Sequence, residues 1–290
     1  MYPEVEYPLV DGGWKVIAPP PDLQGLLPAR NTEPMAVPEP NDHHLYRDRE
    51  GRWHLWACVR GTDVGRMLAH WTSDELTRAP WTFTGDIIRA DRNAGESLVV
   101  WKGQEFIQSP FVVRHDGRFY MLYGGYATGY DTAGDPTISY PAMQNQIALM
   151  HSDDGRVWER HRDEAHYSRV FTGPGAARDP CLLNVDGTWH LYYTGHHDEN
   201  LDKEAIYVRT STNLVDWSQW EVAHFIDEPH RSSRTCESPT VVRRGDLFYL
   251  FRSGGYTGDG NGTVAVFVSR DPADFGRGGD GREHYVCNIN

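Results

Sequence analysis

Three acidic residues, Asp42, Asp179 and Glu237, each stand at the start of a short apolar stretch of the chain. Carboxylates that crowd together at a partly desolvated place raise one another's proton affinity. One of them can then stay protonated near neutral pH and act as an acid, while another stays charged and acts as a base or a nucleophile. Cleavage of a glycosidic bond through an oxocarbenium-like transition state needs such a pair. This chemistry depends on a fold that brings the three acids together.

A repeat in the chain provides a reason for such a fold. Three stretches each read as strand, turn and strand: IQSPFVVRHDGRFYMLYGG from residue 107, ARDPCLLNVDGTWHLYYTG from residue 177 and CESPTVVRRGDLFYLFRSG from residue 236. Their prolines, Pro110, Pro180 and Pro239, are 70 and 59 residues apart, and the same spacings recur at the first aromatic residue of the second strand and at the closing glycine. A fourth copy, NDHHLYRDREGRWHLWACVRG, precedes them with one extra residue in its turn.

Each copy is followed by another strand and a polar turn, so the unit is four antiparallel strands in roughly 60–70 residues, which is typical of a β-propeller blade. The sequence therefore predicts an all-β fold, a single five-bladed β-propeller over residues 1–290. The two termini are expected to form or complete the fifth blade. The expected blades are 42–106, 107–175, 176–234 and 235–275, with 1–41 and 276–290 for the fifth.

In a propeller the innermost strand of every blade starts on the same face, close to the central axis, so residues just before these strands converge. Asp42, Ser109, Asp179 and Ser238 occupy the equivalent position, with Glu237 one residue before Ser238. Taken alone, each acid could be an ordinary turn or cap residue that hydrogen-bonds nearby backbone. Three acids at matched positions of three blades favour a shared acidic site.

The motifs around these acids, Asn41-Asp42, Arg178-Asp179-Pro180 and Cys236–Pro239, resemble those of the five-bladed propeller glycoside hydrolases. These include glycoside hydrolase family 43, with arabinanases, arabinofuranosidases and β-xylosidases, and family 32, with invertases, levanases and inulinases. The repeat and the acids span residues 42–275. Each motif is short, so their joint order and spacing carry the resemblance.

The resemblance to family 43 implies a role for each acid. Asp42 would be the general base that activates water, Asp179 would tune and orient the acid, and Glu237 would be the general acid, with inversion at the anomeric carbon. The implied function is acid–base cleavage of arabinose- or xylose-containing glycans or oligosaccharides. No cofactor is required for it. The family leaves room for a structural Ca²⁺ in the central channel, typically with a histidine of the last blade. His284 is a poor candidate for that histidine, so the site stays open.

Three alternatives stay open. Family 32 implies that Asp42 is a nucleophile and that the anomeric configuration is retained, as in a β-fructosidase; Arg178-Asp179-Pro180 fits that family, whereas Asn41-Asp42-His43-His44 departs from its Asn-Asp-Pro-Asn motif. A phosphorolytic relative would need a basic pocket for phosphate near Asp42. A non-catalytic propeller that binds glycans or proteins is the third alternative, because fold does not fix function.

Residues beside the strand starts, and residues on the loops after each second strand, should contact the sugar. Aromatic rings can stack on sugar faces, while arginine, histidine and amide side chains can reach hydroxyls; an alternative role for Arg178 is a salt bridge that keeps Asp179 ionised. The loop residues could equally be ordinary polar decoration. The candidate substrate-binding residues are Arg178, Gln108, Ser109, Tyr126, His196 and Arg60.

The composition excludes several other classes of partner. The formal net charge of −13 argues against nucleic acid and anionic membrane surfaces, which would repel the chain. No apolar run approaches the roughly 20 residues that span a bilayer. The N-terminus lacks the features of a signal peptide, so the protein is expected to be cytoplasmic, or secreted if a leader was removed. A carbohydrate is the expected partner, and the oligomeric state stays open. The four cysteines are expected to be buried free thiols: Cys58, Cys181, Cys236 and Cys287.

Overall fold

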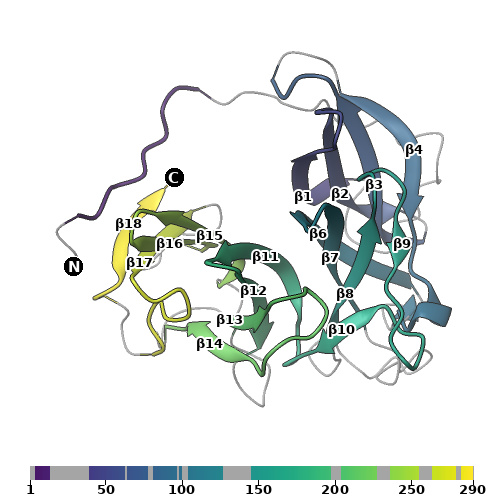
Figure 1. Cartoon of the computed structure of the whole chain (residues 1–290). Helices are drawn as coiled ribbons and strands as arrows, with labels where there is room; N and C mark the ends of the chain where they lie inside the picture. The colour runs from purple at the N-terminus through teal and green to yellow at the C-terminus, as the bar shows by residue number, and fades with distance from the viewer. Residues whose placement is uncertain are drawn as a thin grey trace. The chain divides into compact units, whose positions relative to one another are not determined.

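A computed structural model gives the structure of the chain (Figure 1). Its described part is built almost entirely of β-strands, so the predicted all-β class is confirmed. No helix in this part is long and apolar enough to cross a membrane. The cysteines are all free thiols, but Cys236 and Cys287 are only partly buried. The described residues are 4–13, 39–62, 64–77, 81–96, 98–99, 104–126, 145–196, 204–226, 236–254, 263–278 and 282–289.

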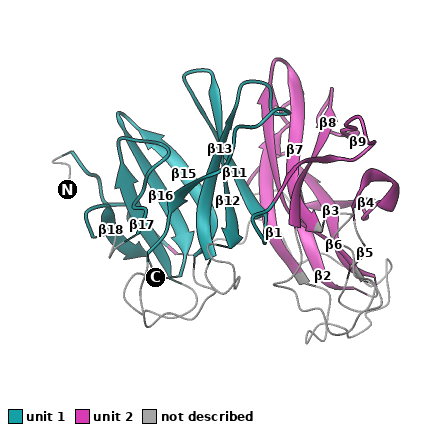
Figure 2. Cartoon of the chain, turned by 90° about the horizontal axis from the view of Figure 1, so that it is seen from below, with its two compact units in different colours: residues 1–12, 173–290 teal, residues 13–172 magenta. Residues whose placement is uncertain are grey.

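The chain forms two compact units, coloured separately in Figure 2. Unit 2 is Gly13–Thr172, and unit 1 is Met1–Gly12 together with Gly173–Asn290. Each unit contains two of the strand repeats that the sequence predicts.

The first sheet of unit 2 has four antiparallel strands in chain order: β1 (Glu39–Arg47), β2 (Trp53–Thr62), β3 (Gly65–Ser73) and β4 (Thr82–Ile88). The middle strands are buried on both faces, which explains their nearly continuous apolar sequence. Trp71 and Trp81 pack in a core cluster on one side, with Trp53 partly buried against it, and Trp56 belongs to a second cluster.

The second sheet of unit 2 is built around β6, β7 and β8, and it meets the first sheet through a short parallel pairing of Gly65 with Glu105. A 3₁₀ turn, η1 (Arg92–Ala94), precedes it. β5 pairs with β6, while β9 and β10 both pair with β8. The strands are β5 (Leu98–Val99), β6 (Gln104–His115), β7 (Arg118–Tyr126), β8 (Asn145–Ser152), β9 (Glu159–Arg160) and β10 (Arg169–Thr172).

Unit 1 contains two four-stranded antiparallel sheets, each in chain order. Aromatic side chains fill their interiors, among them Tyr192, Tyr193 and Tyr207, all at most 1% exposed. The first sheet is β11 (Arg178–Val185), β12 (Thr188–His196), β13 (Glu204–Ser211) and β14 (Glu221–His224). The second is β15 (Glu237–Arg244), β16 (Leu247–Ser253), β17 (Val264–Ser269) and β18 (Tyr285–Ile289).

The C-terminus differs from the prediction, which assigned residues 276–290 to a fifth blade. Strand β18 instead forms the outer strand of the sheet that starts with β15. The segment between β17 and β18 turns away first, because the carboxylate of Asp271 accepts the N–H of Ala273 and the N–H of Phe275 donates to the carbonyl of Ala223 in β14. Residues 14–38 lie outside the described part of the chain, so the fifth blade stays a prediction.

Candidate active site

The first strand of each sheet carries the same backbone irregularity near its start. Strand register shifts between Asn41 and His43 in β1, and at the matching places in β6, β11 and β15. In the last three a proline follows, and proline cannot continue the hydrogen-bonded ladder, so it is confined to bulges or edges. One residue in each bulge has left-handed backbone: Asp42 (φ 40°), Ser109 (φ 53°), Asp179 (φ 57°) and Ser238 (φ 55°).

These are the four positions that the sequence repeat aligns. Left-handed backbone costs a non-glycine residue roughly 1–2 kcal/mol, and bulges are over-represented beside active sites, where they redirect a side chain. The same strained geometry at four matched places gives each sheet one redirected residue, and in two sheets that residue is an aspartate.

Arg178 is the centre of a buried charged cluster in unit 1. Its Nη2 donates to Oε2 of Glu237 at 2.7 Å and also to Oε1 of Glu204. Its Nε lies 3.4 Å from Oδ2 of Asp179. The Arg178 side chain is 10% exposed, so one guanidinium serves three carboxylates in a largely water-free place. The predicted Arg178–Asp179 salt bridge is therefore present, but it is the longest of the three contacts.

Asp179 also joins the two sheets of unit 1. Its Oδ2 accepts hydrogen bonds from Oγ1 of Thr194 on β12, at 3.0 Å, and from the backbone N–H of Ser238 on β15, at 3.3 Å. The carbonyl of Glu237 accepts from Oγ of Ser253 at 3.0 Å. The backbone that carries Glu237 is thus held from both sides, while its side chain is 38% exposed and accessible to a substrate.

Glu204, the first residue of β13, belongs to this cluster although the sequence analysis did not select it. Burial raises the pKa of Glu204 to about 7, and it outweighs the opposing effect of Arg178; the charges of Glu237 and Asp179 raise it further. The strand register places Glu204 opposite His196. The repeat offered a weak signal for it, because Glu204 opens the third strand of its sheet just as Asn145 opens β8.

Asp42 occupies the corresponding bulge in unit 2. Oγ of Ser109 donates to its Oδ2 at 3.2 Å. In both units, therefore, a bulge serine of one sheet contacts the bulge aspartate of the sheet before it. His44, two residues along β1, packs its ring against Phe111 at a centroid distance of 4.0 Å, and burial lowers the pKa of His44 to about 4.

Of the remaining candidate residues, those expected on loops after the second strands belong to the ends of those strands instead: Arg60 to β2, Tyr126 to β7 and His196 to β12. Gln108 is buried on β6 and accepts a hydrogen bond from Arg66. His196 is buried at the end of β12, where its Nδ1 accepts the N–H of Ala176 at 2.8 Å. Arg60 is half-buried near the end of β2, and Tyr126 ends β7, with its side chain outside the described atoms. Contact of these residues with a sugar stays a prediction. Within the described residues, no group of three metal-binding side chains is suited to a metal ion.

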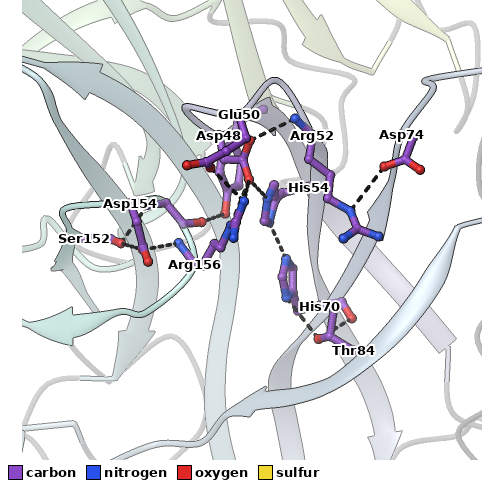
Figure 3. Close-up of polar contacts among 12 residues, drawn as sticks. Asp48, Glu50, Arg52, His54, His70, Asp74, Thr84, Ser152, Asp154 and Arg156 are labelled. Atoms are coloured by element: carbon purple, nitrogen blue, oxygen red, sulfur yellow. Dashed lines mark hydrogen bonds and ion pairs between the residues drawn. The ribbon is translucent and has the colours of Figure 1, made fainter.

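A second buried polar network lies in unit 2 around Asp48, in the turn after β1 (Figure 3). The Asp48 carboxylate accepts from the backbone N–H of Arg52 and from Nε and Nη2 of Arg156 at 2.9 and 2.8 Å. Nε2 of His54 lies 3.1 Å from Asp48, and Nδ1 of His54 lies 2.8 Å from Nε2 of His70. These contacts continue from His70 to Thr84, so the network crosses the sheet from the turn between β1 and β2 to β4.

Comparison with known proteins identifies the fold. The chain matches the crystal structure of a thermostable family-43 glycoside hydrolase with a TM-score of 0.60 and 17% identity, over 82% of this chain and 71% of the other. An endo-arabinanase of family 43 from Bacillus licheniformis matches with a TM-score of 0.54 and 15% identity, over 80% and 72%. A family-32 β-fructofuranosidase of Bombyx mori matches with a TM-score of 0.57 and 17% identity, over 82% of this chain and 46% of the other. The chain therefore has a β-propeller fold of the glycoside hydrolase type, as the sequence resemblance predicted.

The sequence comparisons reach less far. No model of a protein family matches the chain. A 1,2-β-oligomannan phosphorylase of Thermoanaerobacter sp. (strain X514) is 36% identical over 118 residues. That match spans 41% of this chain and 37% of the phosphorylase.

Proposed function

We propose that the chain is a glycosidase that cleaves arabinose- or xylose-containing glycans or oligosaccharides by acid–base catalysis. The observation that carries the proposal is the unit 1 cluster, in which Arg178 contacts Glu237, Asp179 and Glu204 on a fold of the glycoside hydrolase type. Among the described residues this cluster holds more carboxylates than cations. Such an excess favours retention of a proton near neutral pH, which is what a general acid requires.

Glu237 is the proposed general acid. Its carboxyl group is partly exposed, so it can reach a leaving group, and its other contacts fix its position. As the bond between the anomeric carbon and the glycosidic oxygen breaks, Glu237 transfers its proton to that oxygen. Asp179 is the proposed positioning residue, because its Oδ2 accepts the N–H of Ser238, the residue next to the acid.

Asp42 is the proposed general base. It would take a proton from water while the water oxygen forms a bond to the anomeric carbon, which inverts the configuration. Asp42 is the redirected residue of the first bulge of unit 2, as Asp179 is in unit 1. For the carboxyl groups of the base and the acid, a separation of roughly 6.5–9.5 Å would accompany inversion, and roughly 5–5.5 Å would accompany retention.

The proposed sugar contacts are Arg178, Gln108, Ser109, Tyr126, His196 and Arg60. The reaction as proposed uses no cofactor, and a Ca²⁺ would have a structural role.

A panel of aryl glycosides tests the proposal directly. Arabinofuranoside, xyloside, fructoside and galactoside are incubated with the wild type, Glu237→Gln and the control Glu283→Gln, which alters an exposed glutamate of the same unit. We expect Glu237→Gln to lose about 10²–10⁴-fold in kcat/KM with poor leaving groups, and the control to lose nothing. NMR of the first-formed anomer distinguishes inversion from retention. Equal rates for Glu237→Gln and wild type on every cleaved substrate would refute the role of Glu237.

Phosphorolysis is a second candidate, favoured by the similarity to a 1,2-β-oligomannan phosphorylase over 118 residues. Inorganic phosphate would then replace water as the nucleophile, and the product would be a sugar 1-phosphate. Oligosaccharides, β-1,2-mannan oligomers among them, are incubated with and without inorganic phosphate. Free sugar in both cases supports hydrolysis. Sugar 1-phosphate that forms only with phosphate supports the phosphorylase.

A further inference from the structure

We propose that Glu204 is a positioning residue that holds Arg178 against Glu237 and shares a proton with this acid, so that it sets the upper pH limit of the reaction. The inference rests on the proposed glycosidase function and adds to it a residue outside the expected set of three acids. Glu204 acts through Arg178 and contacts no substrate in this proposal.

The geometry places Glu204 and Glu237 on one nitrogen. Nη2 of Arg178 contacts Oε1 of Glu204 and lies 2.7 Å from Oε2 of Glu237. Arg178 pairs with Thr194, and Thr194 pairs with Ile206. Glu204 stands two residues before Ile206, and residues two apart in a strand share one face of the sheet. The register of β11, β12 and β13 therefore directs Glu204 to the guanidinium.

The surroundings of Glu204 favour a proton on it. Its side chain is 5% exposed, and its Oε2 is a buried atom that no described residue hydrogen-bonds. The charged and titratable groups that face it are Arg178 and Asp179 on β11, His196 on β12 and Glu237 on β15. Burial as the main cause, with the charges of Glu237 and Asp179 added, raises the pKa of Glu204 to about 7.

The two glutamates therefore compete for one cation and one proton. When Glu204 is ionised, its charge disfavours ionisation of Glu237 and occupies the guanidinium, so the proton stays on the acid to a higher pH. If Glu204 were neutral, Arg178 would stabilise the ionised form of Glu237 instead. A neutral residue at position 204 should therefore make the acid lose its proton at a lower pH.

Glu204→Gln is a fair test because it preserves size and shape. Asn145 opens β8 opposite Tyr126 as Glu204 opens β13 opposite His196, so an amide already stands at the matching place in another sheet. Glu96→Gln is the matched control. Glu96 is also buried and paired with an arginine, Arg160, but it lies in unit 2, where it accepts hydrogen bonds from Tyr123 and Ser168.

The activity test measures kcat/KM against pH on the glycoside that the panel identifies, once with a poor leaving group and once with 2,4-dinitrophenol. We expect Glu204→Gln to move the alkaline limb down by about one pH unit, which is about a tenfold loss at pH 8 with the poor leaving group. The dinitrophenyl glycoside needs no acid, so its rate should hardly change. Glu204→Asp should restore part of the alkaline limb, and Glu96→Gln should leave it unchanged.

An unmoved alkaline limb in Glu204→Gln, or equal losses on both leaving groups, would overturn the inference and leave the proposed function standing. If the wild type cleaves no glycoside, the proposed function fails, and NMR of ¹³C-labelled glutamate carboxyls tests the coupling alone. The signal that disappears in Glu204→Gln should titrate near pH 7 in the wild type. It should move to lower pH in Glu237→Gln, because a like charge is removed. An unchanged midpoint there would overturn the proton sharing.

Discussion

Two arginine–carboxylate clusters, one in each unit, differ in how many hydrogen-bond donors serve their buried carboxylates; in unit 2 Arg156 also contacts the exposed Glu50. In unit 2, Asp48 is one carboxylate that accepts hydrogen bonds from Arg156, His54 and a backbone N–H. Burial alone would raise the pKa of Asp48, but the hydrogen bonds from Arg156 and His54 outweigh it and lower the pKa to about 2. In unit 1, Arg178 is one cation shared by three carboxylates, and the pKa of Glu204 is raised instead.

The difference separates a structural network from a candidate reactive site. A carboxylate with a surplus of donors is fixed in its charged form and has no proton to exchange near neutral pH. Where several carboxylates share one cation, burial and like charge favour a proton, as they do at Glu204, and perturbed groups of this kind gather at functional sites. The Asp48 network also ends at the hairpin turn of β1, whereas the Arg178 cluster lies at the strand starts where the bulges are.

Removal of the central arginine should show the largest contrast. Arg178→Met leaves three carboxylates without this cation, and removing one partner of a buried ion pair costs about 3–5 kcal/mol. Arg156 is 46% exposed, and without it the buried Asp48 keeps the hydrogen bonds from His54 and from the backbone N–H of Arg52, so Arg156→Met should cost less, about 2 kcal/mol. Urea unfolding at pH 8 measures both. The loss in Arg178→Met should shrink at pH 5, where the carboxylates take up protons more easily. Equal losses in the two variants would remove the distinction between the clusters.

The pH dependence of stability should have opposite signs in the two clusters. Because the pKa of Glu204 rises on folding from 4.5 to about 7, the folded chain binds the extra proton, and the free energy of unfolding falls as the pH rises through this window. Burial lowers the pKa of His70 from 6.5 to about 4, so its contribution is lost as the pH falls from 6.5 to 4. Each effect amounts to at most about 3 kcal/mol.

Two variants separate these slopes. Unfolding free energies are measured from pH 4 to pH 8 for the wild type, Glu204→Gln and His70→Gln. Glu204→Gln should reduce the decrease in the free energy of unfolding as the pH rises above 4.5. His70→Gln should reduce the decrease in the free energy of unfolding as the pH falls below 6.5. A wild-type slope in Glu204→Gln would mean that Glu204 is already ionised in the folded chain.

Loss of the Asp48 charge should weaken the fold and leave the chemistry intact. Asp48→Asn loses its charge-assisted hydrogen bonds with Arg156 and His54. Together these should lower the free energy of unfolding by about 2 kcal/mol. Asp74→Asn is the control, because Asp74 is an exposed partner of Arg52. Thermal unfolding and kcat/KM are measured together. A large fall in kcat/KM with unchanged stability would contradict a structural role for Asp48.

The repeat in the sequence identified four matched positions, although they lie inside β1, β6, β11 and β15 and not just before them, and it did not predict what surrounds them. Pro110, Pro180 and Pro239 mark three bulges because proline interrupts a ladder, and this is a local rule that the sequence displays. The sequence did not predict the part that Glu204 plays, because its contact with Arg178 reaches across three strands. Such contacts depend on the register of the strands. The pairing of β18 with β17 was not predicted for a similar reason, since strand pairing is decided by partners far away in the chain.

The smallest expected contrast compares the two bulge serines. Ser238 contacts Asp179 through its backbone N–H, so Ser238→Gly keeps that contact and relieves left-handed backbone. Glycine also gains freedom in the unfolded chain, so the net change should be a stabilisation of less than about 1 kcal/mol.

Ser109 contacts Asp42 through its side-chain hydroxyl, so Ser109→Gly loses a hydrogen bond to a carboxylate. The loss of this hydrogen bond should outweigh the relief of backbone strain and lower the free energy of unfolding by about 1 kcal/mol net. Melting temperatures and kcat/KM of the two variants measure the difference. Because Asp42 is the proposed base, kcat/KM should fall severalfold in Ser109→Gly and stay unchanged in Ser238→Gly, and identical behaviour of the two would mean that the Ser109 hydroxyl does not orient Asp42.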